Sequence, residues 1–221
     1  MDWSALQVSL SLGVCTVVLL LPAGIAAGHW LATHRFRGQA LVEALVAVPL
    51  ILPPTVLGYY LLTLFGARSP LGAAFERLVG QALPFSFAGL VVASAIANIP
   101  FVVQPIQRGF EAVPPEVREA AACCGLSPWQ RFRLVDLPLA WPAVLTAAIL
   151  TFAHTLGEFG VVLMVGGNLP GRTRTLSIAI YDRMQAFDDR GAATMAAVLL
   201  AVAVTTLVLT SLLAPGRARR G

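Results

Sequence analysis

Five long apolar runs set the hydrophobic pattern of this chain, and shorter polar stretches separate them. Each run is long enough to cross a bilayer, because about 20 helical residues span the hydrocarbon core. The pattern therefore predicts an all-α integral membrane protein, with one transmembrane domain over residues 1–221 and five crossings. The predicted crossings are approximately residues 6–27, 41–65, 85–103, 139–165 and 192–213.

The composition agrees with this pattern. Of the 221 residues, 57% are hydrophobic and 12% are charged, whereas about 25% are charged in a soluble domain. The net charge of +4 is spread over several loops, so no basic tail indicates a nucleic-acid partner. The first run lacks a basic leader and a clear cleavage site, which predicts a retained helix instead of a removed signal peptide.

The arginines predict the orientation, because cytoplasmic loops carry an excess of basic residues. Nine arginines fall on one side of the five crossings and six on the other. The side with nine includes the polar loop of approximately residues 111–138 and, at the C-terminal end, Arg217, Arg219 and Arg220. We therefore expect a periplasmic N-terminus and a cytoplasmic C-terminus.

Prolines and one carboxylate interrupt the apolar runs. Proline bends a helix, and the freed carbonyls then need partners in neighbouring helices or a wet cavity. Kinked helices suit a translocation path, but ordinary packing of a membrane bundle explains them equally well. We expect Glu158 near the outer end of its helix, pairing with an external arginine or capping a backbone turn. The candidate path residues are Pro49, Pro53, Pro54, Thr55, Pro100 and Glu158.

The polar segment EAAACCGLSPWQRFRLVDLP, residues 119–138, carries the signals of two short helices. Pro115 suits the first turn of the first helix, and Gly125 can end it in a left-handed conformation. Ser127 and Gln130 have the spacing of a capping box, which starts the second helix.

We expect the second helix to run to Leu137 and Pro138 to open the next crossing. A capped pair of helices on the cytoplasmic face fits a groove in another protein. An amphipathic helix that lies on the membrane surface is the alternative interpretation.

This segment resembles the EAA loop of bacterial ABC importer permeases. The family pattern is EAA, three residues, Gly, nine residues and Ile-x-Leu-Pro, and the chain matches it with Val135 in place of Ile. The resemblance implies a type I importer fold and a coupling helix that docks into a cleft on each of two separate ATPase subunits. The coupling residues that it implies are Glu119, Ala120, Ala121, Gly125, Leu137 and Pro138.

Three further segments are similar to the molybdate permeases of this family. They are PLILPPTVLGY at residues 49–59, GEFG at 157–160 and GNLPGRTRTLSIAIY at 167–181. The resemblance implies molybdate as substrate, a second copy of the chain and a periplasmic molybdate-binding protein. Tungstate and the sulfate/thiosulfate permeases remain alternatives. Arg172 and Arg174 lie in the last segment, where they either contact the binding protein, attract the anion or pair internally.

Enzymatic chemistry has little support in the sequence. The chain has no lysine and no P-loop motif, so ATP hydrolysis is expected in a partner. Three histidines are present: His29 and His34, which we expect to be solvated, and His154, which shares a helix face with Glu158. They form no metal-binding pattern with cysteine. We therefore expect no catalytic residue, no metal and no cofactor, and a membrane-embedded enzyme is the disfavoured alternative.

Overall fold

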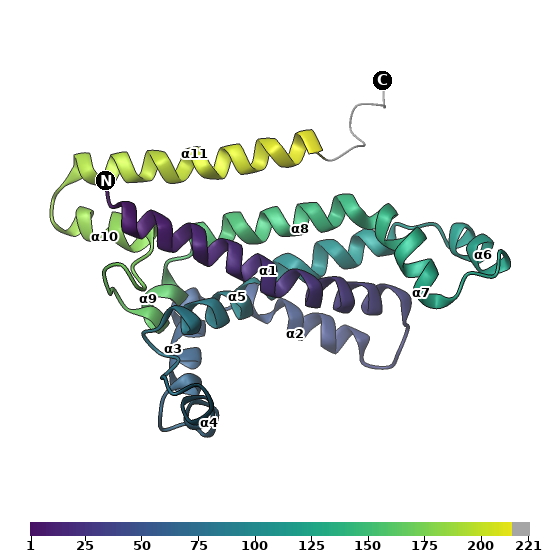
Figure 1. The fold of residues 1–221 in the computed structure, drawn as a ribbon, viewed down its shortest axis with the longest axis horizontal. Coiled ribbons are helices and arrows are strands. Elements are labelled where there is room, and N and C mark those ends of the chain that lie inside the picture. Colours follow the sequence, from purple (N-terminus) through teal and green to yellow (C-terminus); the bar gives the residue numbers. More distant parts are fainter. Residues whose placement is uncertain (214–221) are drawn as a thin grey trace.

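The computed structural model describes residues 1–213, and over this range the chain is helical (Figure 1). The elements are α1 (Trp3–Thr33), α2 (Gln39–Ile51), α3 (Pro54–Phe65), α4 (Pro70–Val79), α5 (Phe87–Glu111), α6 (Pro115–Cys123), α7 (Pro128–Arg131), the π-helix η1 (Phe132–Asp136), α8 (Leu137–Gly157), α9 (Gly160–Gly166), α10 (Leu176–Gln185) and α11 (Asp189–Leu213).

Four helical segments are long and apolar enough to cross a membrane: Trp3–Thr33, Phe87–Glu111, Pro128–Gly157 and Asp189–Val208. The bent pair of α2 and α3 makes a fifth candidate if the two helices count as one span. An all-helical membrane protein with four or five candidate spans is therefore confirmed. Arg217, Arg219 and Arg220, which support the expected orientation, lie outside the described residues.

Helix α5 forms the centre of the bundle and packs against α1 and α8. Its buried residues Val102, Ile106 and Phe110 form one apolar cluster with Val144 and Ala147 of α8. Glycines allow α1 to approach closely: a Cβ added at Gly28 would lie 2.8 Å from Ile106 Cγ2 and 3.0 Å from the backbone nitrogen of Gln107. Small residues of this kind let helix backbones meet in a membrane protein.

The long helices give the molecule two distinct ends. Figure 1 shows α6 and α7 at one end, and α9, α10 and the N-terminus towards the other. We call these the α6 end and the α10 end. Helices α3 and α4 turn away from the bundle on the side of the α10 end (Figure 1).

The structure differs from the predicted elements at two of the apolar runs. The run 41–65 bends by 106° between Ile51 and Pro54, because Pro53 and Pro54 cannot donate backbone hydrogen bonds within a helix. The run 139–165 is interrupted after Gly157, where Glu158 adopts an extended conformation before α9 begins.

Helix α8 begins at Leu137 with Pro138 in its first turn, as expected from sequence, but no break separates it from α7 and η1. The segment Pro128–Gly157 is one continuous helical stretch of 30 residues. Proline lacks the N–H group and its ring excludes the carbonyl four residues earlier, which here belongs to Leu134. The helical turn before Pro138 is wider instead: the backbone N–H of Leu137 donates to the carbonyl of Phe132, five residues earlier. This accounts for η1 in front of Pro138.

Candidate functional site

The loop between α5 and α8 contains the turn that the sequence predicts. Helix α6 begins with Pro115 in its first turn. Gly125 follows in the left-handed conformation, with φ of 80°. Its N–H donates to Ala122 O at 2.9 Å, and the N–H of Leu126 donates to Ala121 O at 3.2 Å. These two bonds form a Schellman motif, so Gly125 ends the helix as predicted.

The second helix of the loop begins at the predicted capping box. The Gln130 backbone N–H donates to Ser127 Oγ, and the Ser127 backbone N–H donates to Gln130 Oε1 at 2.8 Å. The reciprocal bonds satisfy two donors at the start of α7. Trp129 stacks on Phe132 and is 67% exposed.

The loop offers its surface to solvent. None of the residues of α6 is buried, and Glu119, Ala120 and Gly125 are exposed, while Ala121 is half-buried. Leu137 and Pro138 are the first two residues of α8. The turn is thus held by local hydrogen bonds, and one end of the molecule carries a small, exposed helix with almost no side-chain bulk on its alanine side.

Two helix breaks meet nearer the α10 end. The break between α2 and α3 packs against the break between α8 and α9, since a Cβ added at Gly160 would lie 2.7 Å from Pro54 Cβ. Glu158 is buried, and its Oε1 accepts from the Val161 N–H at 3.3 Å. The prediction that Glu158 caps a backbone turn is confirmed. Thr55 lines an open cavity of about 450 Å³ beside it.

Polar side chains link this break to the central helix. His154 Nδ1 lies 3.1 Å from Asn98 Oδ1 and 3.8 Å from Glu158 Oε2. Asn98 in turn donates to Thr155 Oγ1 at 3.1 Å. Pro100 is buried in α5, two residues after Asn98. The structure therefore brings Pro54, Thr55 and Glu158 together, and it adds Asn98 and His154, which the sequence did not single out as path residues.

The two arginines after α9 have different surroundings. Arg174 Nε donates to Asn168 Oδ1 at 2.5 Å, and the guanidinium lies 3.7 Å from Asp182 and 3.8 Å from Asp2. Arg172 is exposed and, within residues 1–213, makes no side-chain ion pair. The internal pairing that was one of three alternatives thus holds for Arg174 and leaves Arg172 available.

Asp2 is also the N-cap residue of α1. Its carboxylate accepts from the Ala5 N–H at 3.0 Å. This hydrogen bond is the main reason why the pKa of Asp2 lies below its usual value, and Ser4 and Arg174 add to the effect while burial opposes it. The α10 end therefore joins the chain's first residues to the loop after α9.

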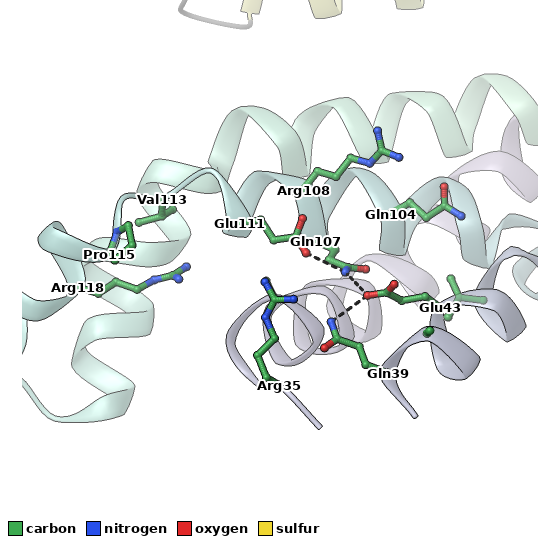
Figure 2. A pocket seen from close by; sticks show the side chains of 13 residues that line it. Arg35, Gln39, Glu43, Gln104, Gln107, Arg108, Glu111, Val113, Pro115 and Arg118 are labelled. Carbon is green, nitrogen blue, oxygen red and sulfur yellow. Dashed lines mark hydrogen bonds between the residues drawn. The ribbon is translucent and has the colours of Figure 1, made fainter. Parts of the chain in front are cut away.

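A polar cavity of about 930 Å³ opens beside the start of α6 (Figure 2). Gln107 Nε2 donates to Glu43 Oε1 at 2.8 Å and to Glu111 Oε1 at 3.0 Å, and Gln39 donates to Glu43 at 2.9 Å. Figure 2 shows the side chain of Arg35 directed toward this group. The residues that line the cavity include Arg35, Gln39, Glu43, Gln104, Gln107, Arg108, Glu111, Val113, Pro115 and Arg118.

Glu43 is the member of this cavity that the sequence interpretation missed. It is the one charged residue inside the apolar run 41–65. An ionisable residue within a predicted crossing is a functional candidate by default. The sequence alone could therefore have identified Glu43 as a candidate. Its partner Gln107 is 64 residues away in the chain, and no local pattern connects the two.

The sequence is similar to known proteins over most of its length. Residues 21–215 match the family described as "Binding-protein-dependent transport system inner membrane component". The molybdenum transport system permease protein of Azotobacter vinelandii is 49% identical over 187 residues, which cover 85% of this chain and 83% of that protein. The sulfate transport system permease protein of Escherichia coli is 37% identical over 182 residues, covering 80% of this chain and 64% of that protein.

A solved structure shares the fold. The bacterial alginate ABC transporter, crystallised with a pentasaccharide-bound periplasmic protein, superposes with a TM-score of 0.74 at 15% identity. The match covers 99% of this chain and 80% of that chain. At this identity the likeness concerns the helical fold alone.

Proposed function

Because the chain belongs to the family of inner membrane components of binding-protein-dependent transport systems, we propose that it is the molybdate-translocating subunit of an ABC importer. As a permease component it spans the inner membrane several times and is not itself an enzyme. ATP hydrolysis belongs to a partner chain, and substrate arrives on a periplasmic binding protein.

The observation that carries the proposal is the exposed α6 turn. Its EAA spacing, its Schellman motif at Gly125 and its capping box at Ser127 make a preformed helix for a groove in the ATPase. A preformed element binds with less loss of conformational freedom than a flexible loop. Glu119, Ala120, Ala121 and Gly125 form the docking surface in this proposal, and Leu137 with Pro138 forms the start of α8 behind it.

In the proposed topology the α6 end is cytoplasmic and the α10 end is periplasmic. The bent pair of α2 and α3 counts as the fifth crossing, as in a type I importer. The supporting argument is the excess of arginine on the α6 side. The whole chain, residues 1–221, then acts as one transmembrane domain with its N-terminus outside.

Molybdate is the substrate that similarity favours. The molybdenum permease of Azotobacter vinelandii shares 49% of its aligned residues with this chain over 83% of its length, whereas the sulfate permease of Escherichia coli shares 37% over 64% of its length. The segment 167–181, which carries the molybdate-type motif, forms the loop around Arg174 and the first turns of α10. Tungstate has nearly the same shape and charge as molybdate, so we expect it to be carried as well.

A second copy of the chain completes the path in this proposal, since two-fold pairing is the commonest closed symmetry. Helix α2 supports the idea because it has no buried residue in the single chain. Leu41, Leu45 and Ile51 are 66%, 61% and 78% exposed. Against another copy, this face would bury apolar surface around a shared axis.

The path itself runs between the two helix breaks and the polar cavity at the α6 end. In this path, Pro49, Pro53 and Pro54 allow the bend of α2–α3 to move against Glu158, and Pro100 lies inside α5. The cavity beside Glu43 and Arg35 forms the cytoplasmic mouth. ATP-driven movement of α6 then biases the bundle between outward-open and inward-open states.

Arg172 contacts the periplasmic binding protein in this proposal. It lines an external groove of about 500 Å³ with Ser4, Gln7 and Ser86, and its guanidinium is not engaged by an ion pair as that of Arg174 is. A carboxylate on the binding protein would be its natural partner.

Genetic replacement tests the function. The chain, expressed with its ATPase and binding protein in a bacterium that lacks its own molybdate permease, should restore molybdenum-dependent growth at low external molybdate. A parallel strain that lacks its sulfate permease should not recover. Recovery of the sulfate strain alone would assign the chain to sulfate and reject the molybdate proposal.

A further inference from the structure

One buried carboxylate joins four separate elements at the α6 end. Asp136, at the last position of η1, is 5% exposed. Arg118 of α6 donates from Nε to Asp136 Oδ1 at 2.7 Å, and His29 Nε2 of α1 lies 3.3 Å from Asp136 Oδ2. The same guanidinium donates from a terminal nitrogen to the carbonyl of Phe110 in α5 at 2.7 Å.

His29 is held in place, although the sequence suggested that it would be solvated. Its ring lies edge-on between Phe110 and Phe132, with centroid distances of 4.9 and 4.8 Å. The side chain is 25% exposed. Two aromatic contacts and the carboxylate thus fix the imidazole, and with it the end of α1, against the loop.

The π-helix is a second, independent feature at this point. Its wide turn ends at Asp136 and follows from Pro138, which blocks the normal α-helical bond to Leu134. Such turns are rare in proteins overall, and those that do occur are often found at functional sites. The extra residue per turn changes the direction of Asp136 relative to a regular helix, and the side chain faces Arg118 and His29.

Helix α6 has few other attachments to the bundle. It has nine residues, none of them buried, and isolated helices of this length are marginal in water. Within residues 1–213, the side-chain hydrogen bonds from α6 to other elements all come from Arg118. A force on α6 therefore reaches the bundle through Arg118 and through the two chain connections.

We propose that Arg118 and Asp136 are positioning residues that make α6 move as one body with the ends of α1, α5 and α8. This inference rests on the proposed function, in which α6 docks on the ATPase. The pair converts a displacement of the docked helix into a displacement of the transmembrane helices. Without the Arg118–Asp136 pair, α6 remains docked on the ATPase but tilts relative to the bundle, and the transmembrane helices do not follow its movement.

The first test compares transport per ATP in reconstituted transporter. Arg118→Gln and Asp136→Asn should keep ATPase binding and basal hydrolysis but lower molybdate uptake per ATP by roughly tenfold or more, because α6 moves separately from the transmembrane helices once this buried ion pair is broken. Arg133→Gln is the matched control, since Arg133 is an exposed arginine in the same loop. Uptake per ATP equal to that of Arg133→Gln in both variants overturns the proposal.

The second test needs no change at the pair. Spin labels at Cys123 of α6 and at an introduced Ala26→Cys in α1, with Cys15 and Cys124 replaced by serine, report the distance between the two elements. The proposal expects this distance to stay constant between nucleotide-free and ATP-bound states of the complex with the ATPase. A change of about one helical turn, roughly 5 Å, would show that α6 and α1 move separately and would overturn it.

The double variant Arg118→Gln with Asp136→Asn completes the design, because it removes both charges together. In the double variant, the distance between the labels at positions 123 and 26 should change when ATP binds. In the labelled protein with an intact Arg118–Asp136 pair, it should stay constant. An unchanged distance in the double variant counts against the proposal. Wild-type molybdate uptake in the same vesicles tests the proposed function separately, since the distance measurement requires only the ATPase and nucleotide.

Discussion

Replacement of Gly125 tests whether the geometry of the α6 turn is needed for docking. The residue has φ of 80°, and a Cβ added there would meet no atom within 4 Å. Alanine therefore causes no steric overlap, and its whole effect is the left-handed backbone, which costs about 1–2 kcal/mol for a residue with a Cβ.

The size of the effect on docking follows from this cost. Helix α6 is short and exposed, so the strain weakens the docking geometry without compensation from a core. Since 1.4 kcal/mol is about a factor of ten, Gly125→Ala should reduce the affinity for the ATPase by roughly 5- to 30-fold. Gly125→Val should be worse, because positive φ is a true outlier for β-branched residues. Gly125→Asn should be milder.

The assay is ATPase binding to the permease in nanodiscs, followed by ATP hydrolysis stimulated by loaded binding protein. Gly80→Ala is the matched control, because Gly80 has φ of 74° and open space but lies after α4, away from the docking loop. It should leave ATPase affinity unchanged. Wild-type affinity for both Gly125→Ala and Gly125→Val would show that docking does not require the left-handed turn at this position.

Three further predictions concern packing, the external loop and orientation. Gly160→Ala should lower thermal stability by about 1–3 kcal/mol, as its Cβ meets Pro54 at 2.7 Å, whereas Gly157→Ala has open space and should match wild type in a melting experiment; equal melting of both would contradict the close contact of the breaks. Arg172→Gln should weaken binding-protein affinity and its salt dependence, while Arg174→Gln should mainly destabilise the loop by no more than about 1 kcal/mol; the reverse pattern, measured by titration and melting, would exchange their roles. In a variant with Cys123 as its single cysteine, an impermeant thiol reagent should label only from the cytoplasmic side, and labelling from outside would reverse the orientation.

Local chemistry explains why the turn between α6 and α7 was predictable from the sequence. Pro115, Gly125, Ser127 and Gln130 act on backbone groups within a few residues of themselves. These hydrogen bonds need no partner from elsewhere in the chain. The overall helical membrane architecture was predictable for a similar reason, because the length and composition of each apolar run decide it.

The remaining features depend on how the backbone rearranges or on partners that are distant in the chain. The widened turn before Pro138 depends on how the backbone hydrogen bonds rearrange around the proline, which spacing alone does not determine. Asp136 finds His29 across 107 residues, and Arg174 finds Asp2 near the other end of the chain. The sequence offered three roles for Arg174, and only the assembled loop selects internal pairing.

In the proposed function, this chain carries molybdate across the membrane at the expense of ATP hydrolysed by a partner chain. The most direct measurement is molybdate accumulation in proteoliposomes that contain the chain and its ATPase, with ATP enclosed and loaded binding protein outside. We expect ATP-dependent accumulation against a molybdate gradient, which stops when the ATPase is inactivated. ATP hydrolysis stimulated by docked binding protein, with internal molybdate no higher than in ATP-free vesicles, would contradict it.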